Sequence, residues 1–168
     1  MFEIDTVVFV DALETEDEVG AVLRTHLMVE KFLDWTFDQF VTEERKQWIQ
    51  RPTNFRGKVS MAVALGLPVV FAGAAIQLNH VRNDLAHRME KMNSSQVEQY
   101  GRDVNKLAAL YEAFAPLQMR KIEFSRKEPG KIYKYGSGNT RLDFVIASIA
   151  LLSTAMGWSL HVQSAGNS

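Results

Sequence analysis

The longest apolar stretch of the chain, residues 142–158, places the strongest constraint on its fold. Apart from Asp143, this stretch consists of apolar residues with a few Ser, Thr and Gly among them. It is shorter than the roughly 20 apolar residues that a membrane-spanning helix requires. We therefore predict a helix over residues 141–158 that is buried in the protein core, and we expect no contact with a membrane.

Length and composition predict a single domain. The chain has 168 residues, of which 46% are hydrophobic, so it can form a core without disulfides or metal. We place this domain at residues 1–162 and predict a disordered tail at residues 163–168. The absence of cysteine excludes a disulfide framework and a thiolate zinc site, and the four histidines lack metal-ligand spacing. The first residues are acidic, unlike a signal peptide, so we expect a cytoplasmic protein.

The rest of the sequence favours an all-α fold, a bundle of about five helices with a small β-hairpin before the last one. Apolar periodicity and end signals predict four further helices, at residues 15–41, 54–65, 70–89 and 94–114. Ser95 and Glu98 have the spacing of a capping box at the start of the last of these four. Two alternating segments, residues 121–125 and 131–135, flank a Pro-Gly turn and predict the hairpin.

The helix predicted at residues 70–89 carries charge beside its core face. At about 100° per residue, one face collects the apolar positions, which are Phe71, Ala74, Leu78, Val81 and Leu85. Arg82 lies only about 40–50° from the centre of this face, where a guanidinium is costly unless a carboxylate or a bound anion accompanies it. His26 and Glu30, one turn apart on the first predicted helix, either face this region or form an exposed pair.

A polar stripe of Asn79, Asn83 and His87 occupies the opposite flank of the same helix. Arg82 and His87 therefore diverge by roughly 140° on a straight helix. For their side chains to converge, the helix must bend, Arg82 must reach around it, or a second subunit must complete the site. We expect a homodimer in which the polar stripe lies at or near the two-fold interface.

Arg82, Asn83 and His87 together have the chemistry of a phosphate site. A permanent cation can hold a phosphate, and an imidazole beside it can transfer a proton. The alternative is structural, with Arg82 in a salt bridge and His87 as an ordinary surface histidine.

The sequence around this box, residues 79–87 (NHVRNDLAH), resembles the signature of the HEPN superfamily, in which Arg is followed four to six residues later by His. Residues 29–33 (VEKFL) are similar to a recurrent sequence in the opening helices of that superfamily. The segment from residue 55 through the box to residue 100 also resembles the mannitol operon repressor family in order and spacing. Together the two resemblances span about residues 20–115.

The HEPN resemblance implies a metal-independent endoribonuclease that needs no cofactor and acts as a dimer, often as a toxin or an antiviral effector. By position, His87 would be the general acid or base, Arg82 would hold the phosphate, and Asn83 would orient one of them. Many toxin members carry a Tyr that a partner antitoxin modifies, and this chain has Met89 at that position. The repressor resemblance implies the alternative, a non-enzymatic regulator that binds another protein.

Charge is segregated along the chain. Residues 1–20 contain seven acidic residues and no Lys or Arg, whereas residues 120–141 are basic and carry aromatic residues among the cations. Such a segment suits single-stranded RNA, which offers phosphates and stackable bases. The candidate RNA-binding residues are Lys121, Arg126, Lys127, Lys131 and Lys134. The alternative is a solvated hairpin without a ligand.

Overall fold

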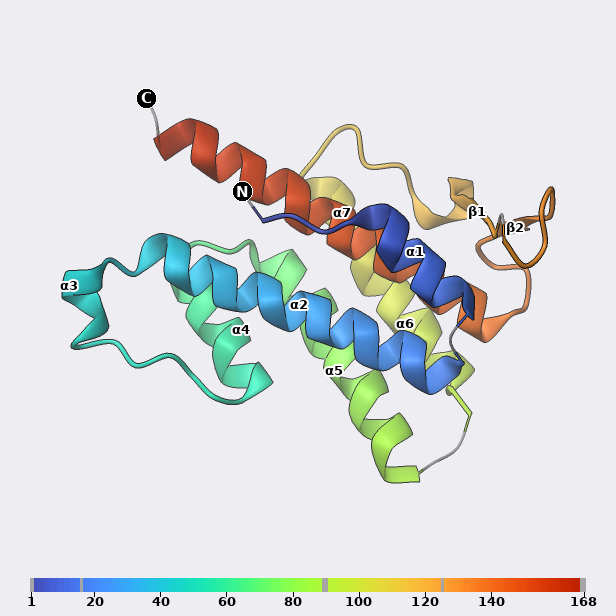
Figure 1. Ribbon diagram of the computed structural model, residues 1–168, viewed down its shortest axis with the longest axis horizontal. Helices are drawn as coiled ribbons and strands as arrows, with labels where there is room; N and C mark the ends of the chain where they lie inside the picture. The colour runs from blue at the N-terminus through green and yellow to red at the C-terminus, as the bar shows by residue number, and fades with distance from the viewer. Residues whose placement is uncertain (1, 16, 89–90, 125, 167–168) are drawn as a thin grey trace.

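The structure, a computed structural model, describes residues 2–15, 17–88, 91–124 and 126–166 and has the predicted all-α fold with a small hairpin (Figure 1). The helices in chain order are α1 Thr6–Thr15, α2 Glu18–Phe40, α3 Glu43–Lys46, α4 Phe55–Ala64, α5 Val69–Arg88, α6 Ser94–Asn105 and α7 Thr140–Gly166. Two short 3₁₀ turns, at Lys106–Ala109 and Leu117–Met119, follow α6. The antiparallel hairpin consists of β1 Lys121–Glu123 and β2 Ile132–Lys134.

Helix α7 is largely buried against α6 and α2, as the apolar stretch predicted. By length and composition it could cross a membrane, but 61% of its most apolar window is buried inside the fold. Its buried hydroxyl groups have hydrogen-bond partners: Thr154 donates to the Ala150 carbonyl at 2.9 Å, and the hydroxyl of Ser148 lies 3.3 Å from that of Tyr100. These bonds remove the cost of burying polar groups in an apolar core.

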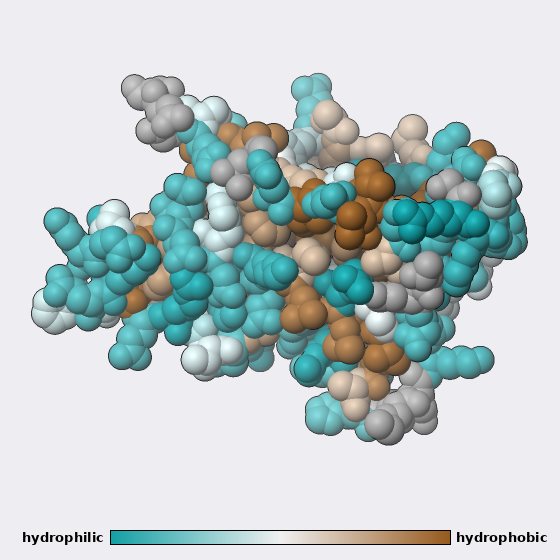
Figure 2. Space-filling view, in the orientation of Figure 1, coloured by the Kyte–Doolittle hydropathy of each residue, from teal (hydrophilic) through white to brown (hydrophobic). Residues whose placement is uncertain are grey.

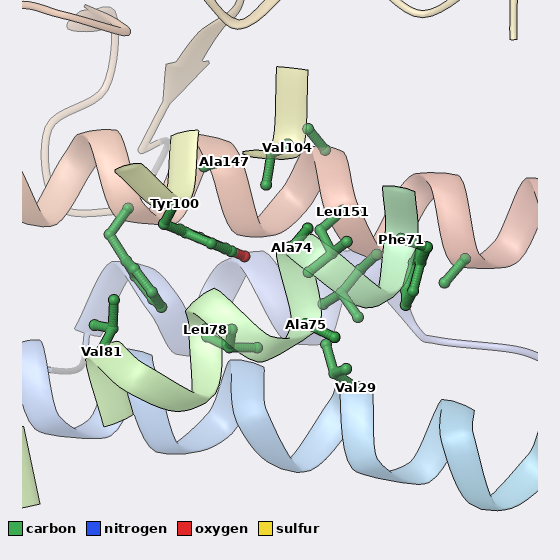
Figure 3. Close-up of a cluster of buried hydrophobic side chains, with 14 of the residues drawn as sticks. Val29, Phe71, Ala74, Ala75, Leu78, Val81, Tyr100, Val104, Ala147 and Leu151 are labelled. Atoms are coloured by element: carbon green, nitrogen blue, oxygen red, sulfur yellow. The ribbon is translucent and has the colours of Figure 1, made fainter. Parts of the chain in front are cut away.

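Helix α5 packs between α2 and α6, with α7 close by (Figure 3). The five apolar positions predicted for its core face are all buried, with exposed fractions of 7% or less. Figure 3 shows Leu78 and Ala75 near Val29 of α2, and Tyr100 of α6 beside Ala147 of α7. The helical period therefore located the core side of α5 and fixed the side on which its polar residues lie.

Several predicted boundaries need correction. Asp17, rather than a residue near Thr15, caps α2, because its carboxylate accepts from the Gly20 backbone at 2.8 Å. Asn93 caps α6 through the Ser95 backbone, so Ser95 and Glu98 do not form the predicted capping box. Helix α6 ends at Asn105 instead of near Phe114, and its last side chain accepts from the Leu117 backbone at 2.9 Å.

The ends of the chain also differ from the sequence prediction. Helix α7 continues to Gly166, so residues 163–166 are helical and not a disordered tail; residues 167–168 lie outside the described residues. Helix α1 was not predicted. It buries Phe9 and Leu13, which are 5% and 0% exposed, and this tertiary packing stabilises a helix too short to form alone.

The hairpin is attached to α1 by a buried carboxylate. Glu14 is only 3% exposed, and its Oε1 accepts from the backbone N–H groups of Arg126 at 2.9 Å and Lys127 at 2.5 Å. Asp11 forms an ion pair with the Arg126 guanidinium at 2.5 Å, and Arg141 donates to the Leu13 carbonyl. The acidic start of the sequence is thus a docking surface for part of the basic segment.

Two glycine-to-alanine substitutions test how the hairpin end packs on α6. A Cβ added to Gly101 would overlap the Tyr135 hydroxyl, whereas a Cβ added to Gly73 on the exposed side of α5 meets nothing within 4 Å. We expect Gly101→Ala to lower the free energy of unfolding by about 1–3 kcal/mol, because Tyr135 must move away from α6. Gly73→Ala should raise it by roughly 0.5–1 kcal/mol through helix propensity. Urea denaturation of both variants measures the two changes in unfolding free energy. If both variants were stabilised, or both destabilised, this packing of Tyr135 on α6 would be contradicted.

Candidate functional site

Arg82 is a half-buried cation without a carboxylate partner among the residues that the structure describes. Its Nη1 donates to Asn83 Oδ1 at 3.0 Å, and its Nε is buried and makes no hydrogen bond. An unsatisfied buried donor on a charged group costs free energy. The site therefore has the electrostatics of an anion-binding position, and the salt bridge predicted as the structural alternative is not found in the described part of the chain.

His26 lies inside the protein next to this site. It is 8% exposed, and its Nε2 donates to Asn79 Oδ1 at 3.1 Å. Its ring stacks on Phe55 of α4, with ring centroids 4.1 Å apart and an interplanar angle of 30°. The sequence allowed His26 either to face the Arg82 region or to form an exposed pair with Glu30. In the structure His26 faces the Arg82 region and contacts the polar stripe of α5 through Asn79.

The surroundings of His26 favour its neutral form. Burial is the largest cause and lowers the pKa of its imidazole below the ordinary value of 6.5. The hydrogen bond to Asn79 and the charge of Glu30 oppose this effect, whereas the positive charge of Arg82 adds to it. A neutral imidazole can hold Asn79 without placing a second cation beside Arg82.

Lys58 of α4, unlike Arg82, is neutralised by carboxylates. Its ammonium group contacts Glu30 Oε1 at 2.9 Å and Asp34 Oδ2 at 2.8 Å, both on α2. Glu30 is therefore paired with Lys58 and does not hydrogen-bond to His26. Helix α2 thus provides two carboxylates for Lys58, whereas in the described residues it provides none for Arg82.

His87 is exposed near the end of α5, and no hydrogen bond or ion pair joins it to Arg82 within the described residues. Helix α5 is continuous from Val69 to Arg88, so five residues still separate the two side chains by roughly 140°. The structure brings together His26, Asn79, Arg82 and Asn83 and leaves His87 apart. Asn79 and His26 were not among the candidate catalytic residues. A sequence signal existed, because His26 occupies the apolar register of Val22, Val29 and Leu33.

The five candidate RNA-binding cations of the hairpin fall into two groups. Arg126 pairs with Asp11 at 2.5 Å, and Lys131 pairs with Glu128 at 2.8 Å. In the described part of the chain, no ion pair involves the side chains of Lys121, Lys127 or Lys134, all of which are exposed. Lys121 and Lys134 are direct cross-strand partners. Like charges opposite each other destabilise a hairpin, and an anion bound between them would remove that repulsion.

Comparison with known proteins adds no family to this geometry: protein-family models, curated proteins and solved structures all give no match. Among the described residues, no group of three or more His, Cys, Asp or Glu side chains is arranged to hold a metal ion.

The buried, neutral state of His26 predicts a pH dependence of stability. Because the folded-state pKa lies below 6.5, the unfolded chain binds more protons as the pH falls past 6.5. The contribution of neutral His26 to the free energy of unfolding should be fully present above that pH. It should be lost progressively as the pH falls from 6.5 to the folded-state pKa. We expect His26→Gln to have a shallower loss of unfolding free energy between about pH 7 and about pH 5 than the wild type. His80→Gln, at an exposed position of α5, is the control, and a slope for His26→Gln equal to that of the wild type would refute the assignment.

Proposed function

We propose that this chain is a metal-independent endoribonuclease of the HEPN type. The observation that carries the proposal is the half-buried Arg82, which is held by Asn83 and has no carboxylate partner in the described residues. A guanidinium in this state suits the bidentate recognition of a phosphate and the stabilisation of its developing charge. The resemblance of residues 79–87 to the superfamily signature supports the same reaction.

The proposed reaction is the attack of an RNA 2′-hydroxyl on the adjacent phosphate. His87 removes the hydroxyl proton, the 2′-oxygen forms a bond to phosphorus, and the bond from phosphorus to the 5′-oxygen breaks. The departing 5′-oxygen takes up a proton from an imidazolium or from water. The products are a 2′,3′-cyclic phosphate and a 5′-hydroxyl, and the step needs no metal or cofactor.

Arg82 and His87 must act on the same phosphate in this reaction, although they diverge on α5. Either Arg82 extends around the helix when RNA binds, or a second copy of the chain supplies the histidine. Asn83 keeps the guanidinium oriented in both arrangements, because it accepts from Arg82 Nη1 at 3.0 Å. The cellular setting that fits an RNA substrate is the cytoplasm, where the enzyme would act as a toxin or defence effector under the control of an antitoxin or another regulatory protein.

The second candidate function is a non-enzymatic regulator of the mannitol-repressor type. Its support is the exposure of His87 away from Arg82, together with large apolar side chains on the surfaces of α1 and α2 that could contact another protein. In this alternative the Arg82 site binds no RNA and cleaves nothing. Activity measurements therefore separate the two functions.

The first test is cleavage of total RNA in EDTA by the wild type and by His87→Ala. Removing the proton-transfer group should lower the rate by roughly 10²–10⁴-fold, while the exposed position leaves folding intact. His80→Ala is a matched control, because it removes another exposed histidine of the same helix. Products with 2′,3′-cyclic phosphate ends are expected. Equal rates for wild type and His87→Ala would end the catalytic assignment, and absence of cleavage by the wild type would favour the regulator.

The second test concerns RNA binding by the hairpin. Replacing Lys121, Lys127 and Lys134 with Gln should weaken binding to single-stranded RNA, and each lost phosphate contact should reduce the log–log salt slope by roughly 0.7. Arg126→Gln combined with Lys131→Gln should change the slope less, since these cations are already paired with Asp11 and Glu128. Fluorescence anisotropy at several salt concentrations measures both. An unchanged slope in the triple variant would mean that the hairpin is a solvated loop.

A further inference from the structure

Three polar side chains on one flank of α5 carry hydrogen-bond donors that nothing in the described chain uses. Asn79, Arg82 and Asn83 fall within about 100° of the helix circumference, because Arg82 and Asn83 follow Asn79 by three and four residues. In the part of the chain that the structure describes, no hydrogen bond involves Arg82 Nη2 or the two amide nitrogens. All three residues are half-buried, but these nitrogens themselves are not buried, so a ligand can reach them.

The oxygen atoms of the two amides, in contrast, are already engaged. Asn83 Oδ1 accepts from Arg82 Nη1 at 3.0 Å, and Asn79 Oδ1 accepts from His26 Nε2 at 3.1 Å. An amide whose oxygen is held by the protein has its nitrogen left for an external partner. The flank therefore offers N–H donors to a ligand, while both of its amide acceptors are occupied.

We infer that Asn79, Arg82 and Asn83 form a cradle for one phosphate group, and that His26 is a positioning residue that holds the Asn79 amide in its donor orientation. A phosphate has only acceptor oxygens and carries negative charge, so donors around a guanidinium match it. Nucleobase edges combine donors and acceptors and fit this set less well. The inference deepens the proposed function, because it rests on phosphate binding by Arg82, and it gives roles to two residues that the proposed reaction does not use.

The surroundings of His26 suit a positioning role. Helix α2 carries hydrophobic side chains on the face seen in Figure 2, whereas His26 of the same helix is turned inward and is 8% exposed. Its ring stacks on Phe55 with centroids 4.1 Å apart, which fixes the direction of the imidazole. Because Asn79 Oδ1 can only accept, His26 Nε2 must carry a proton. Without this N–H group, the Asn79 amide could turn over and present its oxygen to a phosphate.

The next turn of α5 leaves the cradle uncovered. Ala86 follows Arg82 by four residues and Asn83 by three, so it is the neighbour of both on the helix surface. Its side chain is a single methyl group and is exposed. A phosphate can therefore approach the cradle from solvent without displacing a large side chain.

The first test follows the side-chain amide signals of Asn79 and Asn83 in NMR spectra of the full chain. One probe is inorganic phosphate, and the other is a short 2′-O-methyl oligonucleotide, which has phosphodiesters but lacks the attacking hydroxyl. Both amide signals should shift with a common midpoint. Shifts with phosphate identify the free anion as a ligand, and shifts with the oligonucleotide alone identify the RNA backbone. An Asn79 signal that shifts with neither probe overturns the inference.

Asn79→Asp tests the donor without changing the shape of the side chain. The carboxylate still accepts from His26, but it places an acceptor and a negative charge where the amide nitrogen was. We expect the affinity for the probe to fall by roughly 10–100-fold, the range for a hydrogen bond to a charged group. Gln77→Glu adds the same charge about 160° around α5 and should change the affinity by no more than about twofold. Equal losses in the two variants overturn the inference.

Two substitutions of His26 separate hydrogen bonding from packing. His26→Phe keeps an aromatic ring on Phe55 but removes the N–H group, whereas His26→Gln keeps an N–H donor and removes the ring. If His26 positions Asn79, His26→Phe should lower the affinity by roughly 3–10-fold and His26→Gln by no more than about twofold. The reverse order, or equal effects, would mean that His26 only packs against Phe55, and overturns its assignment.

RNA cleavage distinguishes failure of this inference from failure of the proposed function. If the wild type cleaves no RNA but the Asn79 signal shifts with either probe, the phosphate cradle stands and the endoribonuclease does not. If the wild type cleaves RNA and Asn79→Asp cleaves it at the same rate, the endoribonuclease stands and the cradle is overturned.

Discussion

The fold depends on the burial of α7, a helix that is apolar around nearly its whole circumference. Such a helix is stable in water only when other elements cover most of its sides. Helices α2 and α6 pack directly against it, and the turn at Leu117–Met119 adds a further contact. Its buried hydroxyl groups then have to find partners inside the bundle, and Ser148 finds the Tyr100 hydroxyl of α6. Helix α5, with its polar residues, in turn packs against α2 and α6.

The acidic start of the chain holds the basic hairpin in place in the folded protein. Glu14 and Asp11 of α1 meet the backbone and side chain of Arg126, more than 100 residues later in the chain. Since a buried carboxylate is costly unless hydrogen-bonded, the two backbone N–H groups that Glu14 accepts from stabilise its position. This attachment affects only some of the cations in the basic segment. Arg126 is used to fix the hairpin, so the cations available to an external anion are the three without an ion pair in the described residues, Lys121, Lys127 and Lys134.

The sequence predicted the features that depend on local periodicity and missed those that depend on distant partners. All five positions predicted for the core face of α5 are buried, because helical spacing alone decides which side chains share a face; Ala72 and Ala75 are buried as well. Helix α1 was missed, since its run of β-branched residues carries little helix propensity and its stability comes from packing Phe9 and Leu13. The end of α6 at Asn105 was missed because its side chain bonds to Leu117, twelve residues away. The contact of His26 with Asn79 depends on how α2 and α5 pack, which periodicity does not reveal.

The contrast between Lys58 and Arg82 supports the proposal that Arg82 binds an anion. Lys58 contacts carboxylates of α2, Arg82 is close enough to His26 of α2 for their charges to interact, and both cations are partly removed from water. Lys58 contacts two carboxylates within 3 Å, as expected of a cation that serves the fold. Arg82 has only the amide oxygen of Asn83 and a buried Nε without a hydrogen bond, and the nearby His26 is held in a state that adds no charge. A cation kept in this condition destabilises the free protein, and a bound phosphate would remove that cost by supplying the missing negative charge and acceptors.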